Sequence, residues 1–280
     1  MGFHTVCEAQ AKRGKRRPNS AAGTETTQWW IGFKAGTNFS SATPGDQYDF
    51  FSFVTEPQNY EGKQYEGFSR SGSQFGFIIS FEFLPGLSAN FMPAYCTYNY
   101  RYSNTYSWIS TEEADKSLTK TYTINNQLQY VDLPLTFKYE LTKTKLKPYI
   151  QAGGFYGIRT NAIKEADITA IDQASGGEQN LQVDVDKVSN NADDYFVKNN
   201  YGFLAGGGFT YNIGNARLGL EVNYRMGLQN ITNANNRFQD DFLLTGLYDV
   251  MDDMTMDNLE ISVNLLIPLK FITSKDYRPL

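Results

Sequence analysis

Residues 71–91 have the sequence SGSQFGFIISFEFLPGLSANF, and this stretch decides the fold. From Phe75 to Phe83 every second residue is phenylalanine or isoleucine, and most residues between them are small or polar. That two-residue period is typical of a β-strand with one apolar face. Leu84-Pro85-Gly86 then forms a tight turn, and a second alternating stretch begins at Leu87. The segment is therefore predicted to be a hairpin of long strands.

The same pattern recurs along the chain and predicts eight strands. They cover residues 29–40, 71–83, 87–103, 122–141, 146–161, 198–213, 216–230 and 255–271. Each strand is at least as long as the ~9–11 residues that cross a bilayer. The seven connections are alternately long and short. Such alternation places all short turns at one end of a closed sheet, as in outer-membrane barrels. The predicted fold is an all-β, eight-stranded antiparallel up-and-down transmembrane barrel with short periplasmic turns and long external loops.

In the third strand the apolar residues change position in the alternation. Leu87, Ala89 and Phe91 occupy odd positions, whereas Tyr98 and Tyr100 occupy even ones. A one-residue change of this kind predicts a β-bulge near Pro93, since proline is tolerated at bulges.

A soluble barrel with an apolar interior would have the same two-residue period, so other features must decide which face is inside. Only one set of connections is long, and glycines gather on the polar faces of the strands at 146–161, 198–213 and 216–230. The apolar faces end in aromatic residues that suit the two membrane interfaces. These predicted girdle residues are Trp29, Tyr95, Tyr139, Tyr156, Tyr201, Tyr211 and Tyr224. Together these features favour a barrel in the bacterial outer membrane.

The polar faces then carry charges toward the lumen. The predicted lumen charge network consists of Lys34, Glu82, Asp132, Lys138, Glu140, Arg159, Glu221, Arg225 and Glu260. An eight-stranded barrel is just wide enough for its own side chains, and buried charges are costly unless they are paired. We therefore expect salt bridges that plug the barrel. A narrow small-solute channel is the alternative, and it requires a gap in this network.

The predicted external loops are acidic. Residues 41–70, 104–121, 163–197 and 231–254 hold 21 acidic and 7 basic side chains, a net charge of −14; the remaining 9 acidic and 18 basic residues give +9. Such an end suits divalent-cation bridges to lipopolysaccharide or contact with a cationic partner, but loops that are merely solvated are more often acidic in this way. No calcium-loop spacing is present.

Catalytic chemistry has little support in the sequence. The single histidine, His4, lies outside the predicted barrel, so no Ser-His or Asp-His dyad can form within it. Cys7 and Cys96 are far apart and lack metal-site spacing, which favours two unlinked thiols over a disulfide. We therefore expect no enzyme activity, no cofactor and no metal.

The first 28 residues differ from the rest. Ala9-Gln10-Ala11 has the form of a signal-peptidase site, and a basic run, KRGKRR at 12–17, follows it. No apolar segment precedes this site, so either the match is chance or Met1 lies within a longer precursor. We expect a processed or disordered segment at 1–28, the barrel at 29–272 and a periplasmic tail at 273–280. The basic run also suits nucleic acid, but an outer-membrane location excludes that partner.

Five segments of the later strands carry a resemblance to a known family. They are YVDLPL at 130–135, KPYIQAGG at 147–154, YGFLAGGG at 201–208, LEVNYR at 220–225 and NLEISV at 258–263. With these segments the chain resembles the PorT-like outer-membrane barrel domains over roughly 29–272. The resemblance implies an outer membrane of the Bacteroidetes type and, for the family's named member, an accessory role in protein secretion linked to gliding.

The sequence as a whole predicts a non-enzymatic integral outer-membrane barrel with a side-chain-filled lumen. We expect it to act through its acidic external loops as a structural, adhesion or accessory envelope protein. Its expected partners are outer-membrane lipid and lipopolysaccharide, with another envelope or secretion protein as a further candidate. The alternatives are a secretion accessory subunit and a narrow channel.

Overall fold

The computed structural model of the protein describes residues 27–48, 60–113, 116–173, 181–238 and 249–269. The backbone of these residues is mostly extended and forms one antiparallel sheet. The strands are β1 (Gln28–Pro44), β2 (Tyr60–Glu66), β3 (Arg70–Leu84), β4 (Leu87–Phe91), β5 (Ala94–Ile109), β6 (Ser117–Glu140), β7 (Leu146–Asp172), β8 (Leu181–Asn191), β9 (Asn199–Ile213), β10 (Ala216–Gly227) and β11 (Met254–Pro268). Two short 3-10 helices are η2 (Asp193–Tyr195) and η3 (Ala234–Asn236). The described residues include no helix of the length and hydropathy that a membrane span requires.

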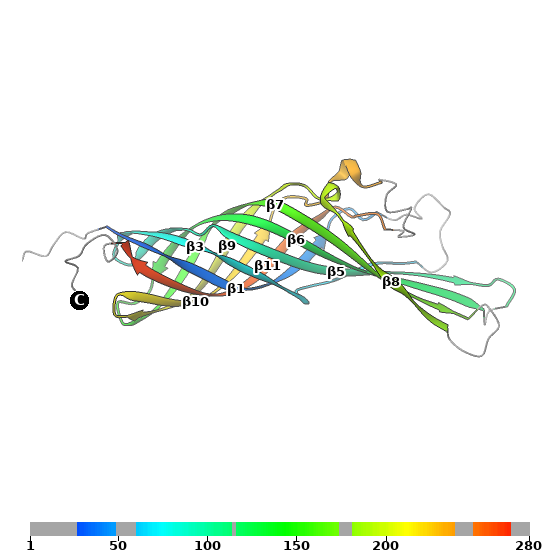
Figure 1. Ribbon diagram of the computed structural model, residues 1–280, viewed down its shortest axis with the longest axis horizontal. Helices are drawn as coiled ribbons and strands as arrows, with labels where there is room; N and C mark the ends of the chain where they lie inside the picture. The colour runs from blue at the N-terminus through cyan, green and yellow to red at the C-terminus, as the bar shows by residue number, and fades with distance from the viewer. Residues whose placement is uncertain (1–26, 49–59, 114–115, 174–180, 239–248, 270–280) are drawn as a thin grey trace, which may run out of the picture.

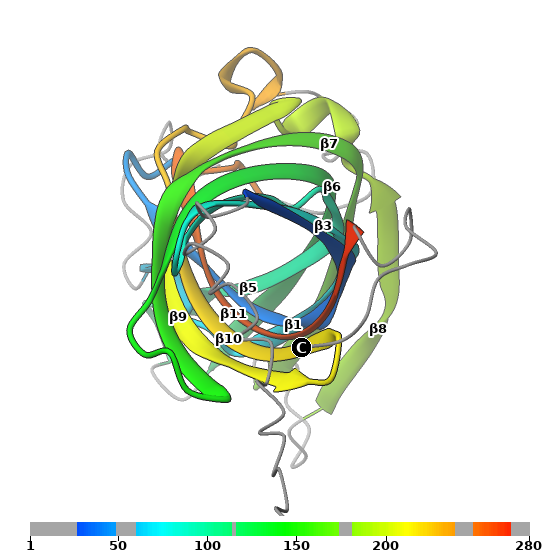
Figure 2. The same ribbon diagram turned by 90° about the vertical axis from the view of Figure 1, so that its left-hand side faces the viewer.

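The sheet closes into a ring. β1 pairs with β3 on one side and with β11 on the other, and the ring continues through β10, β9, β7 and β6. β4 and β5 share one position between β3 and β6. By these pairings the described part of the chain forms a ring of eight antiparallel strand positions. The end-on view in Figure 2 shows the strands encircling a common axis. The predicted all-β up-and-down barrel is confirmed.

The short turns all lie at the end of the barrel where β1 begins and β11 ends. They join β3 to β4, β6 to β7 and β9 to β10. Gly86 and Gly214 adopt φ angles of 82° and 57° in two of these turns, a left-handed conformation that glycine reaches without a Cβ clash. This is the left-hand end in Figure 1.

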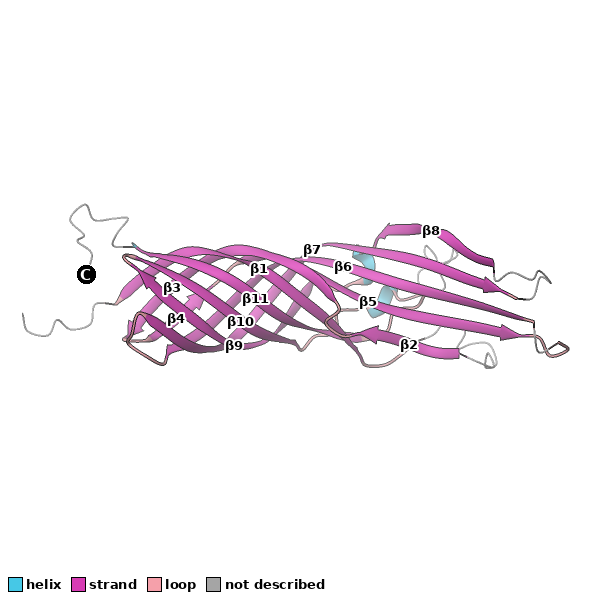
Figure 3. Cartoon of the chain, turned by 90° about the horizontal axis from the view of Figure 1, so that it is seen from below, coloured by secondary structure: helices cyan, strands magenta, loops and turns pink. Residues whose placement is uncertain are grey.

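At the opposite end the structure differs from the sequence prediction, which placed irregular loops at 104–121 and 163–197. β5, β6 and β7 continue as strands far beyond the ring, with lengths of 16, 24 and 27 residues. β2 pairs with β5, and β8 pairs with β7, so the ring's own sheet rises beyond the barrel (Figures 1 and 3). We call the parts of β5, β6 and β7 at 101–109, 117–128 and 163–172 the external ribbon. Its strands leave the lipid, so the strict apolar alternation used to recognise strands is no longer needed there.

The predicted bulge at Pro93 is also wrong. Phe91 lies opposite Leu135 and Ala94 lies opposite Asp132, so the register between this strand and β6 is the same on both sides of Pro93. Odd-numbered residues face outward throughout. The apolar side chains change face because the strand leaves the membrane. Beyond the membrane the outer face contacts water, and the inner face packs in a dry core. A register shift does lie between β6 and β7, where Thr160 is the extra residue.

Inside the external half, the barrel has an aromatic and methionine core. Tyr98, Tyr100 and Tyr102 of β5 line up on the inner face and are at most 1% exposed. Met254 and Met256 of β11 belong to the same buried cluster. Cys96 is also buried there and forms no disulfide with any described residue, whereas Cys7 lies outside the described residues. The expected N-terminal segment and C-terminal tail likewise lie almost entirely outside them.

Candidate functional site

Large apolar side chains cover the outside of the ring. They are more than a third exposed although they lie in regular strands, and residues of this kind occur on every strand position of the ring. Examples are Phe33, Phe77, Phe91, Phe137, Ile150, Phe203, Leu220 and Val263. A continuous apolar belt of this size would be unstable in water, but it matches the lipid-facing surface of a membrane barrel.

Aromatic residues mark the two borders of this belt. Trp29, Tyr139 and Tyr211 are exposed close to the short turns. Tyr95, Tyr156, Tyr201 and Tyr224 are exposed toward the other end, and the Tyr95 hydroxyl donates to Gln129 Oε1 at 2.9 Å. All seven residues that the sequence assigns to the girdle therefore point outward, where amphipathic rings suit the membrane interfaces.

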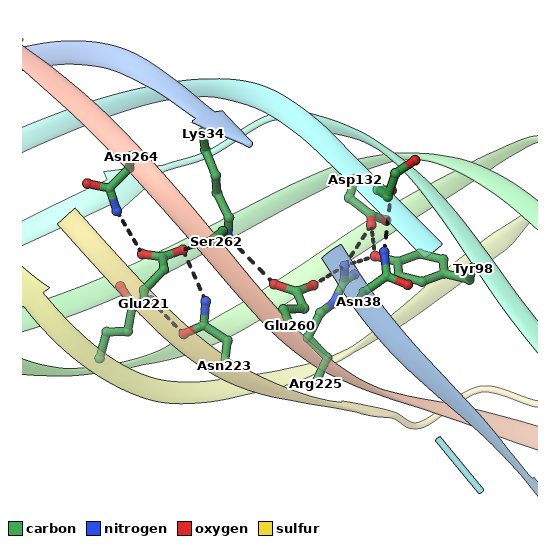
Figure 4. Close-up of polar contacts among 12 residues, drawn as sticks. Lys34, Asn38, Tyr98, Asp132, Glu221, Asn223, Arg225, Glu260, Ser262 and Asn264 are labelled. Atoms are coloured by element: carbon green, nitrogen blue, oxygen red, sulfur yellow. Dashed lines mark hydrogen bonds and ion pairs between the residues drawn. The ribbon is translucent and has the colours of Figure 1, made fainter. Parts of the chain in front are cut away.

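The middle of the lumen holds a dense layer of paired charges, shown in Figure 4. Arg225 on β10 contacts the carboxylates of Asp132 at 2.7 Å and Glu260 at 3.0 Å. The Tyr98 hydroxyl donates to Asp132 at 2.5 Å and accepts from Arg225. We call Lys34, Asp132, Glu221, Arg225 and Glu260 the middle layer; each of these residues is at most 4% exposed.

Glu221 connects the other half of this layer. Its carboxylate lies 2.6 Å from Lys34 Nζ, which is also 3.5 Å from Glu260. The same carboxylate accepts hydrogen bonds from four neutral groups, which come from Tyr149, Asn223, Ser262 and Asn264. Buried carboxylates need this many partners because the low-dielectric interior cannot solvate them.

A second layer, nearer the short turns, holds three of the predicted network residues, Glu82, Lys138 and Glu140, together. Glu140 accepts from Lys147 at 2.7 Å and lies 3.7 Å from Lys138. Arg217 lies 3.3 Å from Glu82 and 3.5 Å from Glu140, and its guanidinium stacks 3.8 Å from the Trp30 ring centre. Lys147 and Arg217 were outside the predicted network, although their positions in the alternation already placed them on the inward face.

Arg159, the last predicted member, lies apart from both layers. It lies next to the β6–β7 register shift, one residue before Thr160, and donates hydrogen bonds to Asp193 and to the backbone carbonyls of Val197 and Phe196. Its side chain therefore fastens η2 to the external rim.

A third cluster, which the sequence did not indicate, closes the external mouth. Lys63 from β2 lies 3.0 Å from Asp252 and 3.5 Å from Asp249, and Lys164 of β7 contacts Asp249 as well. Tyr65 and Tyr102 donate to these carboxylates at 2.7 and 2.6 Å. We call Lys63, Lys164, Asp249 and Asp252 the lid cluster. The sequence pattern places these charges in external loops, because no local motif shows that 249–252 contacts β2 and β7.

The lid cluster lies outside the membrane, and burial shifts the pKa values of its lysine and aspartate differently. Burial lowers the pKa of Lys164, although Asp249 opposes this shift. Burial by itself would raise the pKa of Asp249, but the ammonium groups of Lys164 and Lys63 hold it well below the usual range. Burial and the nearby carboxylate raise the pKa of Tyr102 well above its ordinary value.

The three layers fill the lumen with paired side chains. No three His, Cys, Asp or Glu side chains among the described residues come together in a way that could hold a metal ion. An apolar belt outside, charges inside and short turns at one end define an integral outer-membrane β-barrel.

The sequence matches the family model described as "Outer membrane protein beta-barrel domain" over residues 9–233, and the chain belongs to this family. No curated protein matches the sequence. Among solved structures, Neisserial surface protein A is 12% identical, with a TM-score of 0.33 and coverage of 87% of this chain and 99% of that one. OprG from Pseudomonas aeruginosa is 13% identical, with a TM-score of 0.42 and coverage of 88% and 97%. AlkL is 12% identical, with a TM-score of 0.41 and coverage of 91% and 96%. Membership of this family makes the protein a bacterial outer-membrane protein.

Proposed function

We propose that this protein is a non-enzymatic outer-membrane barrel that presents its external ribbon to another component of the cell surface. The observation that supports this most directly is the apolar tip of the ribbon. Trp108 is 55% exposed, and Ile109, Leu118 and Ile171 are also exposed nearby. Trp108 lies 13 residues beyond the belt residue Tyr95 on β5, or about 43 Å of strand. Large apolar side chains that stand so far from lipid are typical of a contact surface.

The paired strands make this surface rigid. Trp108 lies opposite Leu118, and Thr119 lies opposite Ile171, so three strands support the tip. Hydroxyl pairs between Thr105 and Thr121 at 3.2 Å add cross-strand support. A partner that binds here does not need to order a loop, which would cost conformational entropy.

Site-specific photo-crosslinking tests the proposal. A benzophenone amino acid at position 108 is expected to give a discrete adduct in intact cells. The same group at Lys143, an exposed residue of a short turn, is the matched control and is expected to give no such adduct. Identical adduct patterns at both positions, or none at 108, would contradict a tip-specific partner.

A second candidate follows from the PorT-like resemblance, in which the barrel is an accessory subunit of a gliding-linked secretion system. The segments YVDLPL and KPYIQAGG support it, and they lie on the paired strands β6 and β7. Identification of the adduct at position 108 distinguishes the two. A secretion component favours this second candidate, and another surface protein favours an adhesion or structural role.

A narrow channel is the least supported function. A water path would have to pass the middle layer, where each charged side chain is at most 4% exposed and contacts an opposite charge. We therefore propose that the lumen is closed.

A further inference from the structure

A polar groove of about 310 Å³ lies away from the ribbon tip, mostly among outward-facing residues of the sheet, and two inner-face residues, Tyr100 and Asn126, also line it. Its lining includes Arg70 at the start of β3, Asn99 of β5, Asn125 and Gln127 of β6, and Glu165 of β7. On β5 and β6 the odd-numbered residues point outward at this level, since Tyr98, Tyr100 and Leu128 are buried in the lumen. Its volume falls at the lower end of the ~300–1,000 Å³ of small-molecule sites.

The groove lies just outside the lipid belt. Tyr95, at the border, is opposite Val131, and Asn99 is opposite Gln127 four residues further along β5. Four residues of a tilted strand rise by about 10 Å along the barrel axis. The polar headgroup region of one leaflet is about 5–8 Å deep. The groove therefore opens sideways at the height of the sugars of outer-leaflet glycolipids.

Its polar side chains are held in place before any ligand arrives. The Asn125 side chain is 9% exposed, and its Oδ1 accepts from Arg70 at 2.9 Å and from Arg101 at 2.7 Å. Its Nδ2 donates to Asp167 at 3.3 Å, and Asn99 Nδ2 donates to the Ser71 carbonyl at 2.7 Å. Such fixed groups cost little entropy on binding.

The chemistry of the groove favours a sugar over an anion or a metal. The charged side chains that line the groove are Arg70 and Glu165, and next to them Arg101 pairs with Glu66 and Asn125 donates to Asp167, so positive charge is not in excess. A phosphate site would need an excess of positive charge. Planar amide, carboxylate and guanidinium groups each offer two neighbouring donors or acceptors, and these match adjacent hydroxyls on a sugar ring.

We propose that the outer-face groove binds a saccharide ring, and that its occupant is the sugar portion of the outer-leaflet glycolipid. This site would fix the barrel laterally to neighbouring lipid. It does not depend on the proposed contact at the ribbon tip.

The test uses the full chain in phospholipid nanodiscs. Core oligosaccharide released from lipopolysaccharide by mild acid is titrated by calorimetry, and maltopentaose serves as a glycan from another source. The core oligosaccharide is expected to bind, and Gln127→Ala and Asn99→Ala to weaken it by about tenfold each. Thr121→Val, on the same outer face four residues from Asn125, is the matched control and is expected to bind normally.

Each outcome bears on the proposal. Heat-modifiable migration on gels first shows that every variant is folded. Equal affinity for maltopentaose would overturn the assignment to glycolipid. If neither sugar binds, the saccharide site is overturned. Equal affinity of the wild type, Gln127→Ala and Asn99→Ala for the core oligosaccharide would overturn it as well. Trp108→Ala is expected to retain sugar binding even if it abolishes the surface partner, so the two proposals can fail separately.

Discussion

Replacing Arg225 by methionine removes the central cation of the middle layer. The layer contains two cations and three carboxylates, a formal charge of −1. The Arg225→Met variant leaves Lys34 alone with three carboxylates, a formal charge of −2. It also removes the guanidinium from Asp132, whose carboxylate then keeps the hydrogen bond from the Tyr98 hydroxyl.

Breaking a buried ion pair by removing one partner typically costs about 3–5 kcal/mol, and we expect a loss in that range. Restoring the charge balance should recover much of it. The double variant Arg225→Met with Asp132→Asn returns the layer to −1, so we expect it to be about 2 kcal/mol more stable than Arg225→Met alone.

The assay is reversible urea unfolding of the barrel in phospholipid vesicles, followed by tryptophan fluorescence. Lys116→Met is the control, because Lys116 pairs with Glu113 at 2.6 Å but both side chains are more than a third exposed. Exposed pairs contribute about 0–1 kcal/mol, so this variant should unfold almost like the wild type. A loss below about 1 kcal/mol for Arg225→Met, or no recovery in the double variant, would refute the paired-layer account.

Two further predictions concern the strand contacts and the lid cluster. A Cβ at Gly202 would lie 1.9 Å from the Met226 carbonyl oxygen, whereas at Gly154 it would lie no closer than 3.5 Å to the atoms around it. Gly202→Ala should therefore lose the heat-modifiable folded band on gels and Gly154→Ala should keep it; equal behaviour would contradict the observed strand spacing. Because the folded-state pKa of Asp249 is depressed, its contribution to stability is present above about pH 4 and is lost as the pH falls. The urea midpoint should therefore drop less in Asp249→Asn than in the wild type between about pH 6 and about pH 2.5, and an equal drop would count against a buried lid. The lowered pKa of Lys164 has the same sign, since it also makes stability rise with pH, but its window ends at the ordinary lysine value of 10.5, on the alkaline side of the range tested.

The sequence predicted the membrane part of the fold because lipid imposes a strict rule there. The outer face of the barrel must be apolar and the inner face mostly polar. The residues from Phe75 to Phe83 therefore show a clear two-residue alternation. The seven girdle residues followed from the same rule. Lys34, Asp132, Glu221, Arg225 and Glu260 were named as charges of the lumen face, and the structure places them in contact.

Outside the membrane the rule is lost, and local patterns no longer determine the structure. The external ribbon has tyrosines inside and Thr or Ser outside, which resembles a polar loop when only apolar alternation is counted. Lys63, Asp249 and Asp252 come from segments about 190 residues apart in sequence, so their contacts depend on the closed ring and not on any motif. The groove at Asn99 and Gln127 likewise depends on cross-strand register, which a single sequence does not show.

Single-channel recording in planar bilayers tests the central claim, a lumen closed by paired side chains, most directly. We expect the wild-type protein to insert without steady current steps above background. The Arg225→Met variant should show no steps while the other layers stay intact, because the lid cluster and the layer around Glu140 still block the path. Stable, voltage-independent current steps from the folded wild-type protein would contradict the closed lumen.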